Sequence, residues 1–200
     1  ECQSDRCGAH GIYFPPDDGP RCRLCPPAEA HWLGAWGVTG YEDVSARCVH
    51  LFKYNGRLEM GRLMASLMAD RLGGSLTSMG RRVDVIAPVP LHPFRRWMRG
   101  FNQSEMLAGS LAKVSGLPLD RRLLRRTRYT RRQALMSRER RLANVAGAFA
   151  MRGGRDVTGK GILLVDDVVT TGNTVNECAR VLREGGAREV WVACFSRAGI

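Results

Sequence analysis

Long hydrophobic runs are missing from this chain of 200 residues. No stretch approaches the ~18 consecutive apolar residues that a membrane-spanning helix requires. No charged start followed by an apolar core indicates a secretory signal either. The sequence therefore predicts a protein without a membrane span, and its length suits one α/β domain with a short additional module.

Lysine is scarce, with 3 lysines against 28 arginines, and acidic residues are scarce in the middle of the chain. Residues 81–155 contain 17 arginines and one lysine against four acids, a net charge of +14, while the remainder carries −2. GC-rich codons would explain arginine in place of lysine, but not the missing acids. Such a segment suits single-stranded nucleic acid, and a solvated surface is the alternative.

A phosphate-binding P-loop is also missing, although residues 154–160 have the spacing of its Gly and Gly-Lys positions. A P-loop follows a strand and needs Ser or Thr after the lysine, whereas Gly161 stands here and the segment precedes a strand pattern. We interpret residues 153–160 as a polar turn that leads into that strand.

Cysteine is present but unevenly distributed: three of the seven are scattered in apolar surroundings, and four are crowded at Cys2, Cys7, Cys22 and Cys25. Four thiolates in a C-x₄-C and a C-x₂-C pair can enclose a tetrahedral structural Zn²⁺, and His10 is a substitute ligand. Disulfides are the alternative, but the scattered cysteines favour a reducing cytoplasm. We expect a zinc-ribbon-like module over residues 1–29 and a main domain over residues 30–200.

The most informative segment is residues 161–174, G-I-L-L-V-D-D-V-V-T-T-G-N-T. Residues 162–165 form an unbroken apolar run, typical of a parallel strand covered on both faces. Asp166 and Asp167 follow at its carboxyl end, where open α/β sheets bind ligands. A small-residue turn then leads into a helix pattern over residues 175–184, whose first turn can hold a phosphate. The acidic pair suits sugar hydroxyls or a bound Mg²⁺.

The remaining patterns complete an α/β fold with a mostly parallel sheet flanked by helices. Strand patterns occupy residues 31–41, 83–87 and 190–195, and helix patterns occupy residues 44–53, 59–72 and 104–115. We expect Gly73 and Gly74 to end the second of these helices. The strand, helix and strand over residues 162–195 have the length of a parallel crossover.

The segment over residues 161–174 resembles the signature of the type I phosphoribosyltransferases, which bind 5-phosphoribosyl-1-pyrophosphate (PRPP). The resemblance implies that the acidic pair contacts the ribose hydroxyls, that the turn cradles the 5′-phosphate, and that Mg²⁺ accompanies PRPP. The loop after residues 83–87 corresponds to the pyrophosphate loop of that family. The implied PRPP-binding residues are Asp166, Asp167, Val168, Thr170, Thr171, Gly172, Asn173, Thr174, Pro88, Val89 and Pro90.

Further segments narrow the resemblance to the ComF branch, named for late competence in DNA uptake. They are P-V-P-L followed by R-G-F-N-Q in residues 88–103, F-K-Y-N-G in residues 52–56, and the Gln, Leu, Arg and Asn pattern of residues 126–149. The branch typically carries two closely spaced cysteine pairs, and the C-x₄-C pair here departs from that. Membership implies partners in the competence machinery, and the candidate nucleic-acid contacts are Arg95, Arg96, Arg99, Arg125, Arg126 and Arg128.

Residues 125–141 resemble the hood loop that closes over pyrophosphate in the phosphoribosyltransferases. Arg128, Arg131 and Arg132 are candidates to stabilise the leaving pyrophosphate. The predicted catalytic residues are Arg131 and Arg132 with Asp166 and Asp167. Two functions remain open: a Mg²⁺-dependent phosphoribosyltransferase with an unidentified acceptor, such as a salvage nucleobase, and a DNA-uptake factor that uses PRPP for binding or regulation. Glutamine-dependent amidophosphoribosyl transfer needs a large glutaminase domain, for which this chain has no room.

Overall fold

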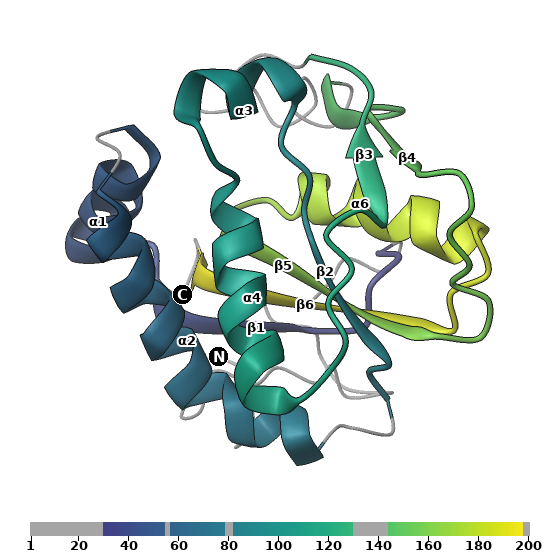
Figure 1. Cartoon of the computed structure of the whole chain (residues 1–200), viewed down its shortest axis with the longest axis horizontal. Helices are drawn as coiled ribbons and strands as arrows, with labels where there is room; N and C mark the ends of the chain where they lie inside the picture. The colour runs from purple at the N-terminus through teal and green to yellow at the C-terminus, as the bar shows by residue number, and fades with distance from the viewer. Residues whose placement is uncertain (1–29, 55–56, 79–81, 130–143, 198–200) are drawn as a thin grey trace.

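A four-stranded parallel sheet forms the centre of the computed structural model, which describes residues 30–54, 57–78, 82–129 and 144–197 (Figure 1). The strands are β1 (Ala35–Gly40), β2 (Val85–Pro88), β5 (Gly161–Val169) and β6 (Glu189–Arg197). Their order is β1-β6-β5-β2, and each neighbouring pair is parallel. The predicted α/β architecture with a parallel sheet is therefore confirmed.

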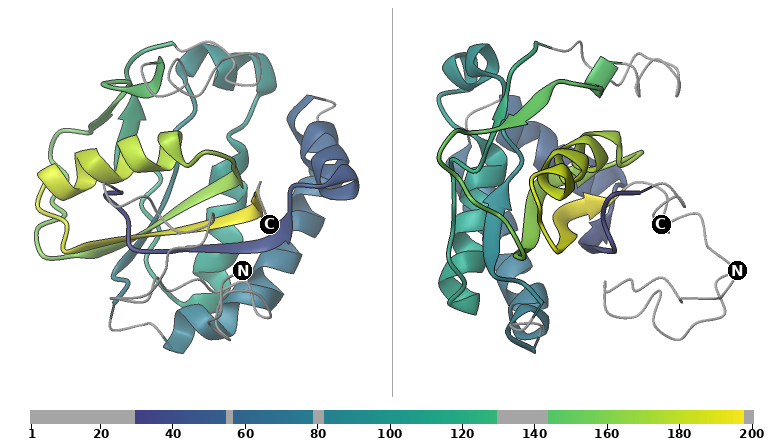
Figure 2. Two further views of the ribbon diagram at one scale, coloured as in Figure 1. Left: turned by 180° about the vertical axis from the view of Figure 1, so that it is seen from behind. Right: turned by 90° about the vertical axis from the view of Figure 1, so that its right-hand side faces the viewer.

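Helices cover both faces of this sheet, so that the domain has three layers (Figure 2). One face carries α2 (Leu58–Ser78) and α4 (Gln103–Ser115), and the other carries α6 (Asn173–Glu184). The helix α1 (Asp43–Tyr54) follows β1, and the short α3 (Pro93–Arg99) follows β2. A small antiparallel ribbon of β3 (Leu124–Arg126) and β4 (Phe149–Met151) completes the fold. None of the helices among the described residues is long and apolar enough to cross a membrane.

The hydrophobic core is divided by the sheet into two clusters. Alternate residues of β5 point to opposite faces, so Ile162 and Leu164 join one cluster and Leu163 and Val165 join the other. This explains why the strand has no polar alternation. The first cluster contains the apolar side of α6, and the second contains Met64, Met68 and Leu72 of α2. Leu63 and Leu67 of the same helix are exposed and do not belong to this core.

Two sequence expectations about element ends are wrong. First, α2 continues past Gly73 to Ser78, because this glycine lies where α2 packs against α4: a Cβ there would come 2.7 Å from the Val114 side chain. Second, β5 continues to Val169, so the acidic pair lies inside the strand and not after it. No sequence pattern indicated α3 or the ribbon. The predicted zinc-ribbon-like module over residues 1–29 lies outside the described residues.

Candidate functional site

The register of the sheet brings the two predicted ligand loops together. Pro88 at the end of β2 pairs with Val165, the residue before the acidic pair, and the Val89 amide donates to the Val165 carbonyl at 2.9 Å. The segment that leaves β2 therefore starts beside Asp166. Carboxyl ends of adjacent parallel strands are the usual ligand site of an open α/β sheet, and here the pairing is directly observed.

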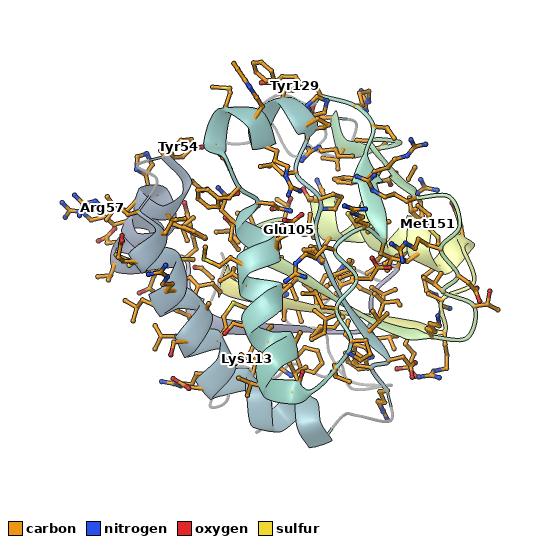
Figure 3. The ribbon with its side chains drawn as sticks, in the orientation of Figure 1. Tyr54, Arg57, Glu105, Lys113, Tyr129 and Met151 are labelled. Atoms are coloured by element: carbon orange, nitrogen blue, oxygen red, sulfur yellow. The ribbon has the colours of Figure 1, made fainter. Side chains whose placement is uncertain are left out.

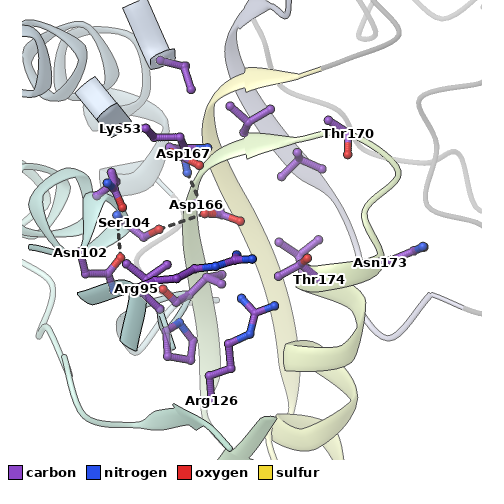
Figure 4. Close-up of a pocket in the computed structure, with 18 of the residues that line it drawn as sticks. Lys53, Arg95, Asn102, Ser104, Arg126, Asp166, Asp167, Thr170, Asn173 and Thr174 are labelled. Carbon is purple, nitrogen blue, oxygen red and sulfur yellow. Dashed lines mark hydrogen bonds and ion pairs between the residues drawn. The ribbon is translucent and has the colours of Figure 1, made fainter. Parts of the chain in front are cut away.

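A cavity of about 480 Å³ opens at this edge (Figure 4). It gathers residues that are far apart in the sequence, from α1, from the loop after β2, from α3 and α4, and from the end of β5. Of the predicted PRPP contacts only Pro88 does not line it. The polar lining consists of Tyr41, His50, Lys53, Tyr54, Arg95, Arg99, Asn102, Gln103, Ser104, Arg126, Asp166, Asp167, Thr170, Thr171, Asn173 and Thr174.

Asp166 is held from two sides. The Ser104 hydroxyl and the Asp167 amide both donate to its Oδ1, each at 2.9 Å. Burial raises the pKa of Asp166 from 3.8 to about 7, and the neighbouring Asp167 charge adds to the effect, while Lys53 and the two hydrogen bonds oppose it. Ionisation of the Asp166 carboxyl group is therefore costly at this buried position. A ligand that donates hydroxyls or brings a cation would favour the ionised form.

Asp167 forms an ion pair that sequence reasoning missed. Lys53 Nζ lies 2.8 Å from Asp167 Oδ2, and the two side chains are 23% and 7% exposed. Burial alone would lower the pKa of Lys53, but attraction to Asp167 and, more weakly, to Asp166 leaves it raised. The available signal was a lysine that ends a helix pattern beside Phe52, in a chain with 3 lysines against 28 arginines.

Asn102 joins α4 to the loop after β2. Its Oδ1 accepts from the Ser104 amide at 3.2 Å and caps the helix, while its Nδ2 donates to the Val89 carbonyl at 3.2 Å. Ser104 in the first turn is thereby aimed at Asp166. The R-G-F-N-Q segment thus has a structural function: it fixes the helix that supplies the hydroxyl partner of the acidic pair.

The opposite end of the cavity has the properties of an anion site. Gly172 adopts a left-handed φ of 76° at the start of α6, and no side chain caps this end of the helix. Its first-turn N–H groups can therefore donate to a phosphate. Arg95 and Arg126 reach into the space between Asp166 and Thr174 (Figure 4). Burial, and then the neighbouring Arg95, lowers the pKa of Arg126, as expected where cationic groups are gathered.

The donor set fits a magnesium ion that arrives with a phosphorylated ligand. Among the described residues, no group of three or more His, Cys, Asp or Glu is placed to hold a metal ion alone. Asp166 and Asp167 supply carboxylate oxygens at one edge of the cavity. Mg²⁺ is commonly bound by one or two carboxylates together with substrate phosphates, keeping several waters. Asp166 would hold it together with phosphate oxygens of the ligand, because Asp167 Oδ2 is already paired with Lys53, and the ion would neutralise phosphate charge.

The predicted nucleic-acid arginines do not form one surface. Arg99 and Arg126 line the cavity with Arg95, whereas Arg96 pairs with Glu105 at 2.7 Å. Arg128 donates to the carbonyls of Asn144 and Ala146 at 3.3 and 2.7 Å, and so ties the residues after β3 to those before β4. Separately, a basic hollow of about 370 Å³ is lined by Arg122, Arg125, Arg152, Gly153 and Arg155.

The remaining predicted site residues lie outside the described residues. They are the two candidate catalytic arginines of the hood loop, Arg131 and Arg132, and the four candidate zinc ligands, Cys2, Cys7, Cys22 and Cys25.

Comparisons with known proteins find relatives of this chain in sequence and in structure. The phosphoribosyl transferase domain family matches residues 102–199. The DNA utilization protein YhgH of Salmonella typhimurium is 36% identical over 178 residues, covering 88% of this chain and 76% of that protein. Competence protein F of Haemophilus influenzae is 28% identical over 194 residues, covering 96% of this chain and 83% of that protein. A purine phosphoribosyltransferase structure from Pyrococcus horikoshii is 21% identical, covers 65% of this chain and 73% of its own, and gives a TM-score of 0.40.

The sequence relatives extend over most of the chain, and the matched domain includes the acidic strand and the turn that follows it. On these grounds the chain belongs to the ComF family and carries a phosphoribosyltransferase-type domain.

Proposed function

We propose that the protein binds PRPP with Mg²⁺ in the cavity at the carboxyl edge of the sheet. The observation that carries this proposal is the composition of the cavity: oriented carboxylates at one side, arginines across from them, and an uncapped helix start behind a Thr-Thr-Gly-Asn-Thr turn. A phosphorylated sugar with vicinal hydroxyls has complementary groups at each of these places. A cavity of about 480 Å³ also lies within the usual size range of small-ligand sites.

Each part of the cavity takes a defined part of the ligand in this proposal. Asp166 and Asp167 accept hydrogen bonds from the ribose hydroxyls. Residues 170–174 and the first turn of α6 hold the 5′-phosphate. Arg95, Arg99 and the loop that begins at Val89 face the pyrophosphate, because they line the same cavity on the side of β2. Guanidinium groups suit this position since they bind phosphate oxygens in a bidentate manner.

DNA uptake is the proposed biological context. The relatives carry the names DNA utilization protein and competence protein, and the middle of this chain carries +14. We propose single-stranded DNA as the macromolecular ligand, with proteins of the competence machinery as further partners, in the cytoplasm. A structural Zn²⁺ at Cys2, Cys7, Cys22 and Cys25 belongs to the same proposal. The alternative is a phosphoribosyltransferase of nucleobase salvage without a DNA role. The acidic pair and the Thr-Thr-Gly-Asn-Thr turn that line the cavity support this alternative equally well.

Calorimetric titration of PRPP with Mg²⁺ tests the proposal. The protein is compared with Asp166→Asn, Asp167→Asn, a double variant that keeps side-chain shape and removes both charges. The matched control is Glu59→Gln, Asp70→Asn, which removes two exposed acids from α2. Inorganic phosphate in place of PRPP controls for simple anion binding.

Binding of PRPP that the pocket variant loses and the α2 variant keeps is the expected result. Equal affinity in all three proteins would contradict the assignment of the acidic pair. If the unaltered protein binds no PRPP, the cavity is not a PRPP site. Where PRPP binds, release of pyrophosphate in the presence of individual nucleobases distinguishes the salvage enzyme from the DNA-uptake factor.

A further inference from the structure

The helix α3 has an unusual composition for its place in the fold. It spans seven residues, Pro93–Arg99, and none of them is buried. Its apolar side chains are nevertheless large: Trp97 is 79% exposed, Met98 64% and Phe94 50%. Burial in the core therefore does not explain these residues. Clustered exposed apolar side chains on a protein surface commonly mark an interaction site.

The aromatic rings on this surface are arranged together. Phe94 and Trp97 are three residues apart and lie on one side of the helix, with ring centroids 6.3 Å apart. Tyr129, which follows β3 and is 51% exposed, meets Phe94 edge to face at 5.9 Å and His92 at 5.3 Å. Figure 3 shows Tyr129 beside α3. We call Phe94, Trp97 and Tyr129 the aromatic platform.

The helix that carries two of these rings is capped at both ends. His92 caps the start of α3 by accepting from the Phe94 amide at 3.2 Å, and Pro93 occupies the first turn. At the other end Gly100 adopts a left-handed conformation and its amide donates to the Arg96 carbonyl at 2.8 Å. The backbone that positions Phe94 and Trp97 is therefore already ordered before a ligand binds, which lowers the entropy cost of binding.

Positive charge surrounds the platform. Arg95 lies over the Tyr129 ring at 5.3 Å, and Arg99 lies over the Tyr54 ring at 5.1 Å. Arg96 of α3 forms an ion pair with Glu105. Partial burial lowers the pKa of His92, and the charges of Arg126 and Arg95 lower it further, which indicates the positive potential at this surface. Arg95 and Arg99 also line the main cavity, so the platform adjoins the cavity entrance.

We propose that the aromatic platform binds single-stranded nucleic acid by stacking bases on Trp97 and Phe94 while Arg96 of α3, whose side chain is 55% exposed, contacts a phosphate. The ligand must offer flat apolar faces and repeated negative charges, and single strands combine the two. The proposal rests on the single-strand part of the proposed function and names the place and the mode of binding. It also places the strand beside the candidate PRPP cavity.

Tryptophan fluorescence provides the assay, because Trp32, Trp36 and Trp191 are at most 4% exposed and Trp97 is the exposed one. Titration with an oligothymidylate of about 16 nucleotides should quench emission from Trp97, since stacked bases quench indole. Affinity is measured in parallel by anisotropy of a labelled oligonucleotide. Trp97→Ala and Phe94→Ala are each expected to weaken binding by about 5- to 100-fold.

Three controls isolate stacking. Leu63→Ala removes an exposed apolar side chain from α2 and should bind like the unaltered protein. An abasic phosphodiester of the same length should bind the unaltered protein and Trp97→Ala equally. The slope of affinity against salt should not change in Trp97→Ala, because no charge is removed. Since α3 has no buried residue, the variants should melt at the same temperature and still bind PRPP.

The outcomes separate the two proposals. Tight oligothymidylate binding that neither variant weakens overturns the platform and leaves single-strand binding intact. Absence of binding by the unaltered protein overturns single-strand binding and the platform together, whatever PRPP does. Quenching by phosphatidylglycerol vesicles but not by oligothymidylate overturns the platform in favour of a membrane surface. If the unaltered protein binds oligothymidylate through the platform but does not bind PRPP, only the assignment of the cavity is contradicted.

Discussion

Replacing Asp166 by Asn should stabilise the folded protein, and more strongly as pH rises. The fold raises the pKa of Asp166 from 3.8 to about 7, first through burial and then through the Asp167 charge. Between these two values the native state binds more protons at this position than the unfolded chain does. Stability of the unaltered protein therefore falls as pH rises through this interval, and the penalty is complete above pH 7. Asparagine has no charge to desolvate.

The magnitude follows from the two pKa values. The full difference between the two pKa values corresponds to a gain in unfolding free energy of at most about 4 kcal/mol at pH 8, and to less than half of that at pH 5. The carboxamide oxygen of the introduced asparagine can keep the two hydrogen bonds that Ser104 and the Asp167 amide donate to Oδ1. The difference in unfolding free energy between the unaltered protein and Asp166→Asn therefore measures the effect of the charge and not a change in packing.

Urea unfolding at pH 5 and pH 8 provides the assay, with the unaltered protein, Asp166→Asn and Asp70→Asn. The last variant removes an exposed acid from α2 and should change stability by less than about 0.5 kcal/mol at either pH. A gain for Asp166→Asn that is larger at pH 8 than at pH 5 is expected. Equal gains at both pH values, or a loss at pH 8, would refute the reasoning that an ionised Asp166 destabilises the fold.

Three other changes have defined outcomes. Lys53→Met removes the partner of Asp167 and should lower the free energy of unfolding by about 1–3 kcal/mol. This loss of stability should grow above pH 7, because Lys53 opposes the raised pKa of Asp166. A loss of equal size at pH 5 and pH 8 would contradict this. Gly161→Ala places a Cβ 1.6 Å from the Arg82 carbonyl oxygen and should cost about 3 kcal/mol in thermal or urea unfolding, whereas Gly74→Ala, with no atom within 4 Å, should be neutral or stabilising. If the four N-terminal cysteines bind zinc, metal analysis should find about one Zn²⁺ per chain; a folded, zinc-free protein would end that hypothesis.

The sequence was most informative where one segment contains both the structure and the chemistry. The apolar run before Asp166, the small-residue turn and the amphipathic α6 lie within residues 161–184, so their pattern predicted the strand, the turn and the helix together. Local patterns succeed here because the burial of a strand or a helix face is recorded in consecutive residues.

The sequence was least informative where the site depends on residues that meet only in the folded chain. Lys53 and Ser104 contact the acidic pair from α1 and α4, and no local pattern predicts that either side chain reaches a carboxylate of β5. The end of α2 was predicted wrongly because Gly73 serves a helix contact with Val114, which outweighs its weak helix propensity. The helix α3 was missed because it is short and its aromatic residues face solvent.

The strand order has a consequence for how the chain acquires its site. Among the described strands, β1 borders only β6, which follows the other strands of the sheet in the chain. The strand β1 and the attached α1 therefore lack this sheet neighbour until β6 has been synthesised. Lys53 comes from that same α1, and Asp167 from β5. A nascent chain stopped before β6 can pair β2 with β5 but cannot dock β1. If ligand binding depends on Lys53, a newly made molecule can therefore bind its ligand only after β6 has joined the sheet.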